Sequence, residues 1–189
     1  MTPSKTPHAT TICLVRHAQS APSDDVAEAD WPLSTLGEQQ AQALIETLAP
    51  LDITEVVSSP YRRAVATLQP FASHIGASIV IEHDLRERLL TLDPHADWQR
   101  MLEYHWRNPH HAEPGAESNV ACEQRVRSCL TRIAQRLTGK NVVVASHGNA
   151  IALMLGAIDP SFGYEGWRSM KNPDCFRLRY ESQRWHWLR

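Results

Sequence analysis

The chain has 189 residues, of which 42% are hydrophobic and 21% are charged, a composition that excludes collagen-like and disordered proteins. Its 19 Lys and Arg residues nearly balance 21 Asp and Glu residues, and the formal charge of −2 gives no footprint for nucleic acid or a membrane surface. We therefore expect no nucleic-acid or membrane partner. A local cluster of positive groups must hold any anionic ligand.

Nothing near the N-terminus resembles a targeting segment. Residues 1–9 are polar and lack an apolar stretch, and no window approaches the ~18 apolar residues of a membrane span. We expect a flexible N-terminus over residues 1–9, a single domain over residues 10–189, and a cytoplasmic protein. The four cysteines include no CxxC pair, which favours reduced thiols over disulfides.

Short apolar runs predict the central strands. The runs at 12–15, 56–57 and 142–145 are rich in β-branched residues, as in strands that are buried on both faces, and 79–81 is a weaker fourth candidate. Strands that alternate with helices predict an α/β fold, a three-layer α/β/α sandwich with a mostly parallel central sheet.

Segments with helical periodicity lie between these strands. Thr35 and Glu38 precede the first with the spacing of a capping box. Gly76 should close the second in a left-handed conformation, and Pro70 should kink it. The apolar positions of the three segments fall within residues 41–48, 65–75 and 126–137.

Residues 89–118 interrupt this alternation and predict a helical insertion, with a short helix near 98–106. Its four histidines match no HExxH or zinc-finger spacing, and we predict no metal site; they are His95, His105, His110 and His111. Two interpretations of this segment stay open: it forms a lid over a ligand pocket, or its side chains pack in the core. The residues concerned are Trp98, His105, Trp106 and Arg107.

Two of the predicted strands run directly into histidines. Residues 12–15 lead into Arg16 and His17, and residues 142–145 lead into a Ser-His-Gly tripeptide that contains His147. In open α/β sheets, ligands bind beyond the carboxyl ends of the strands. If the two strands are parallel and adjacent, both histidines meet at that edge.

The third strand adds positive charge to the same edge, because residues 56–57 lead through Ser58, which we expect to shape the turn or cap the helix, to Arg62 and Arg63. Arginine binds phosphate oxygens through a planar fork, and histidine can accept a phosphoryl group. A carboxyl group must protonate the leaving alcohol, and Glu87 is the best-placed candidate. These residue types together predict a phosphate site.

Several blocks of the sequence resemble the motifs of one family, in matching order and spacing. Arg16-His17-Ala18-Gln19-Ser20 resembles the RHG[EQ][ST] signature of the histidine phosphatase superfamily, the phosphoglycerate-mutase-like proteins. The further blocks are Leu33-Ser34-x-x-Gly37-x-x-Gln40-Ala41, Ser58-Ser59-Pro60-Tyr61-Arg62-Arg63-Ala64-x-x-Thr67, Leu85-Arg86-Glu87, Pro114-Gly115-Ala116-Glu117-Ser118, Ser146-His147-Gly148 and the approach to the last strand at Asn172.

The resemblance implies a phosphoglycerate-mutase-like fold and a reaction through phosphorylated His17. It implies that Arg16, Arg63 and His147 hold the phosphate and that Glu87 exchanges protons with the leaving group and water. It implies no metal or organic cofactor. Arg62 is then a solvated helix residue.

Gln19 and Ser23 complete the set of phosphate-binding positions that the first block implies. Three residues depart from the family pattern: Ala18 replaces a glycine, Ser23 an asparagine and Ala66 a glutamine. The pattern that usually follows the acid is also absent after Glu87.

We predict a metal-independent phosphatase that acts on a small-molecule phosphate monoester. Two alternatives stay open: a phosphoglycerate-type mutase and a non-catalytic phosphate-binding module. The physiological substrate and the oligomeric state do not follow from the sequence.

Overall fold

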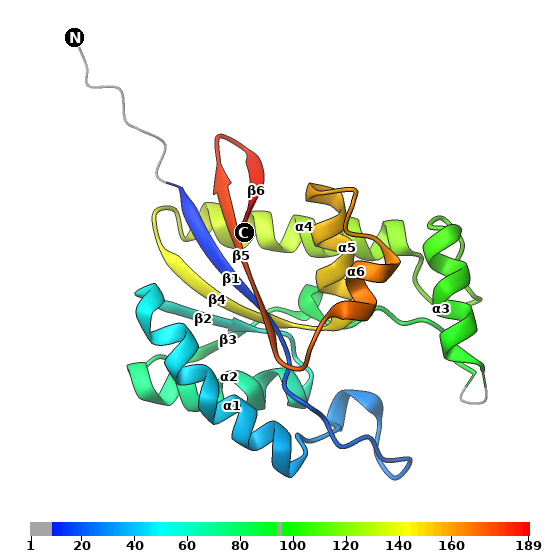
Figure 1. Ribbon diagram of the computed structural model, residues 1–189, viewed down its shortest axis with the longest axis horizontal. Coiled ribbons are helices and arrows are strands. Elements are labelled where there is room, and N and C mark those ends of the chain that lie inside the picture. Colours follow the sequence, from blue (N-terminus) through cyan, green and yellow to red (C-terminus); the bar gives the residue numbers. More distant parts are fainter. Residues whose placement is uncertain (1–8, 94–95) are drawn as a thin grey trace.

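The computed structural model describes residues 9–93 and 96–189, so the predicted flexible N-terminus lies almost wholly outside the described residues, as does His95. Six strands form one sheet in the order β3-β2-β4-β1-β5-β6 (Figure 1). β3, β2, β4 and β1 are parallel, β5 runs antiparallel to β1, and β6 runs antiparallel to β5. The strands are β1 (Thr10–Arg16), β2 (Glu55–Ser58), β3 (Ile79–Ile81), β4 (Asn141–Ser146), β5 (Asp174–Glu181) and β6 (Arg184–Leu188).

Helices cover both faces of this sheet. α1 (Thr35–Leu48) and α2 (Arg62–Ile75) lie on one face, and α4 (Asn119–Arg136), α5 (Gly148–Ile158) and α6 (Tyr164–Ser169) lie on the other (Figure 1). α3 (Trp98–Arg107) stands at one end of the molecule, which confirms the predicted helical insertion. Three short 3-10 turns complete the chain: η1 (Glu28–Asp30), η2 (Ala49–Leu51) and η3 (His83–Leu85).

The side chains of β1 explain why both faces are covered. Ile12 and Leu14 pack into the cluster formed with α4 and α5, whereas Cys13 and Val15 pack into the cluster formed with α1 and α2. Successive strand residues point to opposite faces, so a continuous apolar run needs a hydrophobic layer on each side. A fully buried aliphatic side chain contributes roughly 1.5–3 kcal/mol. The three-layer α/β prediction is confirmed.

The predicted capping box at Thr35 was wrong by one residue. Ser34 is the N-cap, and its hydroxyl accepts the Gly37 backbone N–H at 3.0 Å. A side chain at Gly37 is excluded because its Cβ would lie 2.0 Å from the Gln19 carbonyl oxygen. The loop after β1 lies so close to the first turn of α1 that only glycine fits at position 37.

The second helix ends as predicted, and the kink at Pro70 stays a prediction. Gly76 adopts a left-handed conformation at φ +66°, which confirms its predicted position after the helix. α2 continues through Pro70 to Ile75. No helix in the described part of the chain is long and apolar enough to cross a membrane.

Candidate active site

His17 and His147 lie together at the carboxyl edge of the sheet. β1 pairs with β4 in parallel, and their last residues, Arg16 and Ser146, lie opposite each other. The residue that follows each strand is a histidine. The two ring centroids are 5.3 Å apart. The structure thus brings together the two residues that the sequence placed at adjacent strand ends.

Neighbouring backbone groups fix the protonation of the His17 ring. Its Nδ1 lies 2.7 Å from the Ala18 carbonyl oxygen, which can only accept, so Nδ1 carries the proton. Nε2 is therefore unprotonated, and its lone pair accepts a hydrogen bond from Arg63 Nε at 3.1 Å. The amide of Asn172 also donates to the His17 carbonyl oxygen at 2.8 Å, which anchors the backbone.

Burial, with the Arg63 charge as the next cause, lowers the pKa of His17 from 6.5 to about 3. Ring ¹⁵N shifts should therefore show the neutral Nδ1–H form between about pH 5 and 8. Between the two pKa values the unfolded chain binds more protons, so this histidine reduces stability as pH falls through that window. A titration midpoint of His17 near its ordinary value would contradict this geometry.

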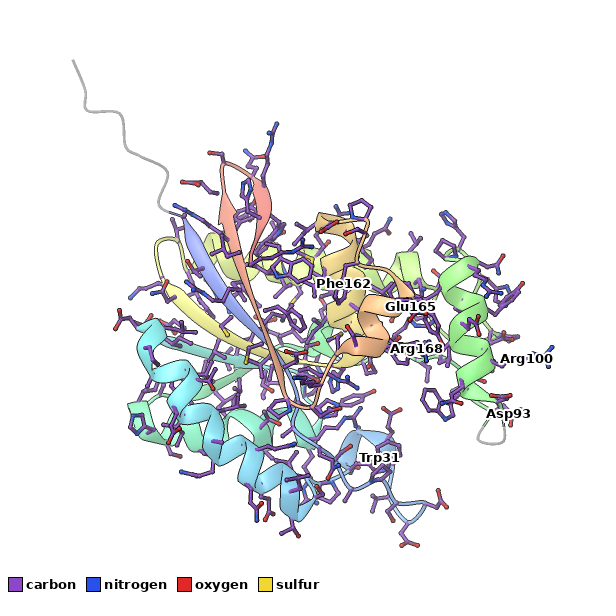
Figure 2. The ribbon with its side chains drawn as sticks, in the orientation of Figure 1. Trp31, Asp93, Arg100, Phe162, Glu165 and Arg168 are labelled. Carbon is purple, nitrogen blue, oxygen red and sulfur yellow. The ribbon has the colours of Figure 1, made fainter. Side chains whose placement is uncertain are left out.

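Arg63 is buried and fully engaged. While Nε donates to His17, Nη1 donates to the Glu28 carbonyl oxygen and Nη2 to Glu28 Oε1, each at 2.7 Å. The guanidinium also lies over the rings of Tyr61 at 4.9 Å and Trp31 at 5.5 Å. Trp31, labelled in Figure 2, belongs to the segment between β1 and α1. Sequence reasoning missed Glu28, because no motif marks it.

His147 is completely buried at the start of α5. Its Nε2 lies 2.7 Å from the Ser59 hydroxyl, and its Nδ1 has no hydrogen-bond partner within residues 9–93 and 96–189. Burial, followed by the charge of His17, lowers the pKa of His147 well below its ordinary value. A neutral imidazole with one unpaired nitrogen is available to a ligand.

Arg16 and Trp167 present two N–H donors above Gly148. A Cβ on Gly148 would lie 3.2 Å from Trp167 Nε1 and 3.3 Å from Arg16 Nε. Both nitrogens are buried without a partner in the described chain, although Arg16 Nη1 donates to the Met170 carbonyl oxygen at 2.8 Å. Buried donors without acceptors are costly, and an anion at this position would satisfy them. No sequence motif indicated Trp167.

Glu87 caps the first turn of α5. Its carboxylate accepts the backbone N–H groups of Asn149 at 3.2 Å, Ala150 at 3.1 Å and Arg88 at 2.8 Å. α5 begins directly after His147, so this places a carboxylate next to the second histidine. Oε1 accepts two of these N–H groups and Oε2 accepts one, so Oε2 has a position left to carry a proton.

Comparison with known proteins assigns this arrangement to a family. Residues 12–189 match the sequence model of the histidine phosphatase superfamily, branch 1. The chain belongs to this superfamily. A probable phosphoglycerate mutase, GpmB, of Salmonella choleraesuis is 26% identical over 191 residues, which cover 92% of this chain and 86% of that protein.

Solved structures of the superfamily include both phosphatases and mutases. A mycobacterial glucosyl-3-phosphoglycerate phosphatase in complex with VO3 is 25% identical, with a TM-score of 0.75 and coverage of 94% of this chain and 96% of that chain. A phosphoglycerate mutase of Bacillus anthracis is 18% identical, with a TM-score of 0.77 and coverage of 96% and 92%, and shows the shared fold. The chain is therefore a histidine phosphatase superfamily enzyme, a phosphatase or a mutase.

Two residues that the resemblance marked for phosphate binding have their side chains bonded to other groups. The Gln19 side chain accepts the Ser34 hydroxyl at 2.7 Å, and the Ser23 hydroxyl donates to Asp25 at 3.2 Å. Arg62 is exposed, one residue before the buried Arg63. The structure therefore gathers Arg16, His17, Arg63, His147 and Glu87, whereas phosphate binding by Gln19 and Ser23 stays a prediction.

The described part of the insertion packs on the domain. His105 is completely buried against Arg88, and Trp106 packs on the hydrophobic core beneath α4 and α5. Trp98 and Arg107 are exposed, and Arg107 pairs with Glu103 at 2.5 Å. Within the described residues, one group could hold a metal: His105, His111 and Glu113.

Proposed function

We propose that this chain is a phosphatase that hydrolyses small-molecule phosphate monoesters through a phosphohistidine on His17, without a metal in the reaction. One observation carries the proposal: the unprotonated Nε2 of His17 faces the buried guanidinium of Arg63 at 3.1 Å. A lone pair and a fixed positive charge are what in-line phosphoryl transfer needs from the protein.

In the first step Arg63 Nε–H turns from Nε2 to a phosphoryl oxygen, and the released Nε2 lone pair forms an N–P bond as the ester P–O bond breaks. Glu87, in its protonated form, gives its proton to the departing oxygen, which leaves as an alcohol. Arg16, Arg63, His147 and Trp167 supply hydrogen bonds to the phosphoryl oxygens, where negative charge gathers. Arg63 Nη2 donates to Glu28 Oε1 at 2.7 Å, so the substrate must share the guanidinium with this carboxylate or displace it.

In the second step water attacks phosphorus and the N–P bond breaks. Glu87 takes the proton from the water, and phosphate leaves with His17 restored. The backbone N–H groups of α5 hold this carboxylate in place next to His147.

Glu87→Gln tests the acid role through the dependence on the leaving group. We expect kcat/KM for an alkyl phosphate to fall by at least about 100-fold, because the alkoxide needs a proton. For 4-nitrophenyl phosphate, whose phenolate leaves unprotonated, we expect a fall below about tenfold. Glu82→Gln, which alters a carboxylate paired with Arg136 at 3.1 Å, is the control. Equal losses on both substrates would remove Glu87 from this role.

The function itself is tested by hydrolysis of 4-nitrophenyl phosphate with and without EDTA. Phosphate release that the chelator does not change supports the proposal. Chelator-sensitive release would overturn metal independence, and a protein that binds phosphate without turnover would be a binding module.

The mutase alternative rests on the similarity to the Salmonella protein named above. A mutase must return the phosphoryl group from His17 to a second hydroxyl instead of to water. Incubation with 3-phosphoglycerate and a trace of 2,3-bisphosphoglycerate separates the two, because a mutase forms 2-phosphoglycerate and a phosphatase forms inorganic phosphate.

A further inference from the structure

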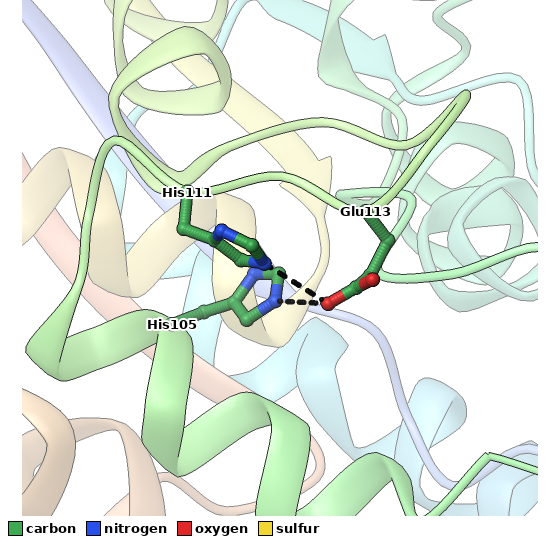
Figure 3. Close-up of side chains that lie close together, drawn as sticks. All are labelled: His105, His111 and Glu113. Carbon is green, nitrogen blue, oxygen red and sulfur yellow. Dashed lines mark hydrogen bonds and ion pairs between the residues drawn. The ribbon is translucent and has the colours of Figure 1, made fainter.

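Three potential metal ligands lie together on the insertion, outside the phosphate site. His105 is near the end of α3, and His111 and Glu113 follow in the loop that leads to α4 (Figure 3). Glu113 Oε1 is 3.1 Å from His111 Nε2 and 3.5 Å from His105 Nε2, and all three ligand atoms lie within 4.8 Å of one another. Figure 3 shows both rings directed at the same carboxylate oxygen.

These separations suit a zinc ion. Zinc binds imidazole nitrogen and carboxylate oxygen at about 2.0–2.2 Å in tetrahedral geometry, which sets ligand atoms roughly 3.2–3.6 Å apart. The two nitrogen–oxygen distances are already close to this range. The side chains of His111 and Glu113 are 40% and 33% exposed, so an ion can enter from solvent and keep water as a fourth ligand.

The unpaired nitrogen of His105 is a second, independent observation. The ring is completely buried, and its Nε2, directed at Glu113, has no hydrogen-bond partner within the described chain. A buried polar atom without a hydrogen bond is unfavourable, and a bound cation at Nε2 would satisfy it. The ring is already held in place, because Arg88 Nη1 contacts Nδ1 at 3.0 Å.

The positive charge of Arg88 lies close to the proposed cation and disfavours its binding. Its guanidinium only donates, so in the metal-free ring Nδ1 accepts and Nε2 carries the proton. Zinc at Nε2 displaces that proton to Nδ1, which can then no longer accept from Arg88, but Arg88 Nη1 keeps its second bond, to the Glu117 carbonyl oxygen at 2.8 Å. The metal therefore replaces two hydrogen bonds, Arg88–His105 and His111–Glu113, by three ligand bonds.

We propose that His105, His111 and Glu113 bind a structural zinc ion that fastens the loop after α3 to the domain. The ion is structural, because its ligands come from α3 and the loop that follows it and not from the strand ends that carry His17 and His147.

The test uses the full chain after removal of metal by dialysis against a chelator. Titration with Co²⁺ should give one equivalent of bound ion with visible d–d absorption, and zinc should displace it and raise the melting temperature. His111→Ala and Glu113→Gln should each weaken zinc binding by more than the roughly 10–100-fold that loss of a supporting residue costs. Both residues are partly exposed, so we expect both variants to fold.

His110→Ala is the matched control, because His110 is the exposed neighbour of His111 and lies outside the cluster. It should bind zinc as the unaltered chain does. Wild-type protein that binds no stoichiometric zinc would overturn the proposal, as would His111→Ala protein with unchanged affinity. Loss of zinc with phosphatase turnover retained separates this result from failure of the proposed function.

Discussion

Replacing His17 by alanine should lower phosphate release by at least about 10³-fold, the loss expected when the nucleophile of a two-step reaction is removed. The neighbouring imidazole, His147, is completely buried, whereas His17 is 8% exposed, so we expect His147 to hold the phosphate and not to replace the nucleophile. The measurement is kcat/KM for 4-nitrophenyl phosphate.

His74→Ala serves as the control, because His74 is an exposed histidine on α2. It should leave kcat/KM within about twofold, as surface substitutions usually do. Inorganic phosphate should still bind to His17→Ala protein, because Arg16 and Arg63 remain. Turnover that survives in His17→Ala protein would exclude the phosphohistidine route.

Replacing Arg63 by alanine should reduce kcat/KM by about 10²–10³-fold, the usual loss for one fixed donor to developing charge. Its guanidinium is the group closest to the His17 nucleophilic nitrogen, at 3.1 Å from Nε to Nε2. The buried charge also binds Glu28, so the variant leaves that carboxylate, which is exposed to solvent, without its partner.

Arg62→Ala is the adjacent control. Arg62 is the first residue of α2 and is exposed, whereas Arg63 is buried. Activity of the Arg62 variant should stay within about twofold of wild type. Equal losses in the two variants would mean that net positive charge, and not the placed guanidinium, serves the reaction. Urea unfolding of both proteins checks that each is folded.

The strands and the meeting of the two histidines could be predicted because they depend on local pattern. A short apolar run rich in β-branched residues indicates a buried parallel strand, and β1 and β4 each run directly into a histidine. Adjacent parallel strands then place His17 beside His147. The β5–β6 hairpin was not predicted, because its strands are partly exposed and lack a continuous apolar run.

The contacts around the histidines could not be predicted, because they come from segments whose paths the sequence does not determine. Glu28 reaches Arg63 from a 3-10 turn, and Trp167 reaches Gly148 from a helix of six residues. Conversely, Gln19 and Ser23 follow His17 closely in sequence, but their side chains bond to Ser34 and Asp25. Position in a motif did not determine side-chain direction.

Ala18 shows how a departure from the family pattern is accommodated. Its methyl group is completely buried in a small cluster with Leu33 and Ala41, and its backbone N–H donates to the Thr67 hydroxyl at 2.9 Å. The carbonyl of the same residue accepts His17 Nδ1. The added methyl group therefore packs away from the hydrogen bonds that orient His17.

The most direct test of the mechanism is to trap the phosphorylated enzyme. Rapid denaturation in alkali during turnover of a phosphate ester, followed by mass spectrometry, should find phosphate on the peptide that contains His17, stable to base and lost in acid. The same treatment of His17→Ala protein should find none. Turnover without any phosphorylated His17, or with phosphate on another residue, would contradict the account.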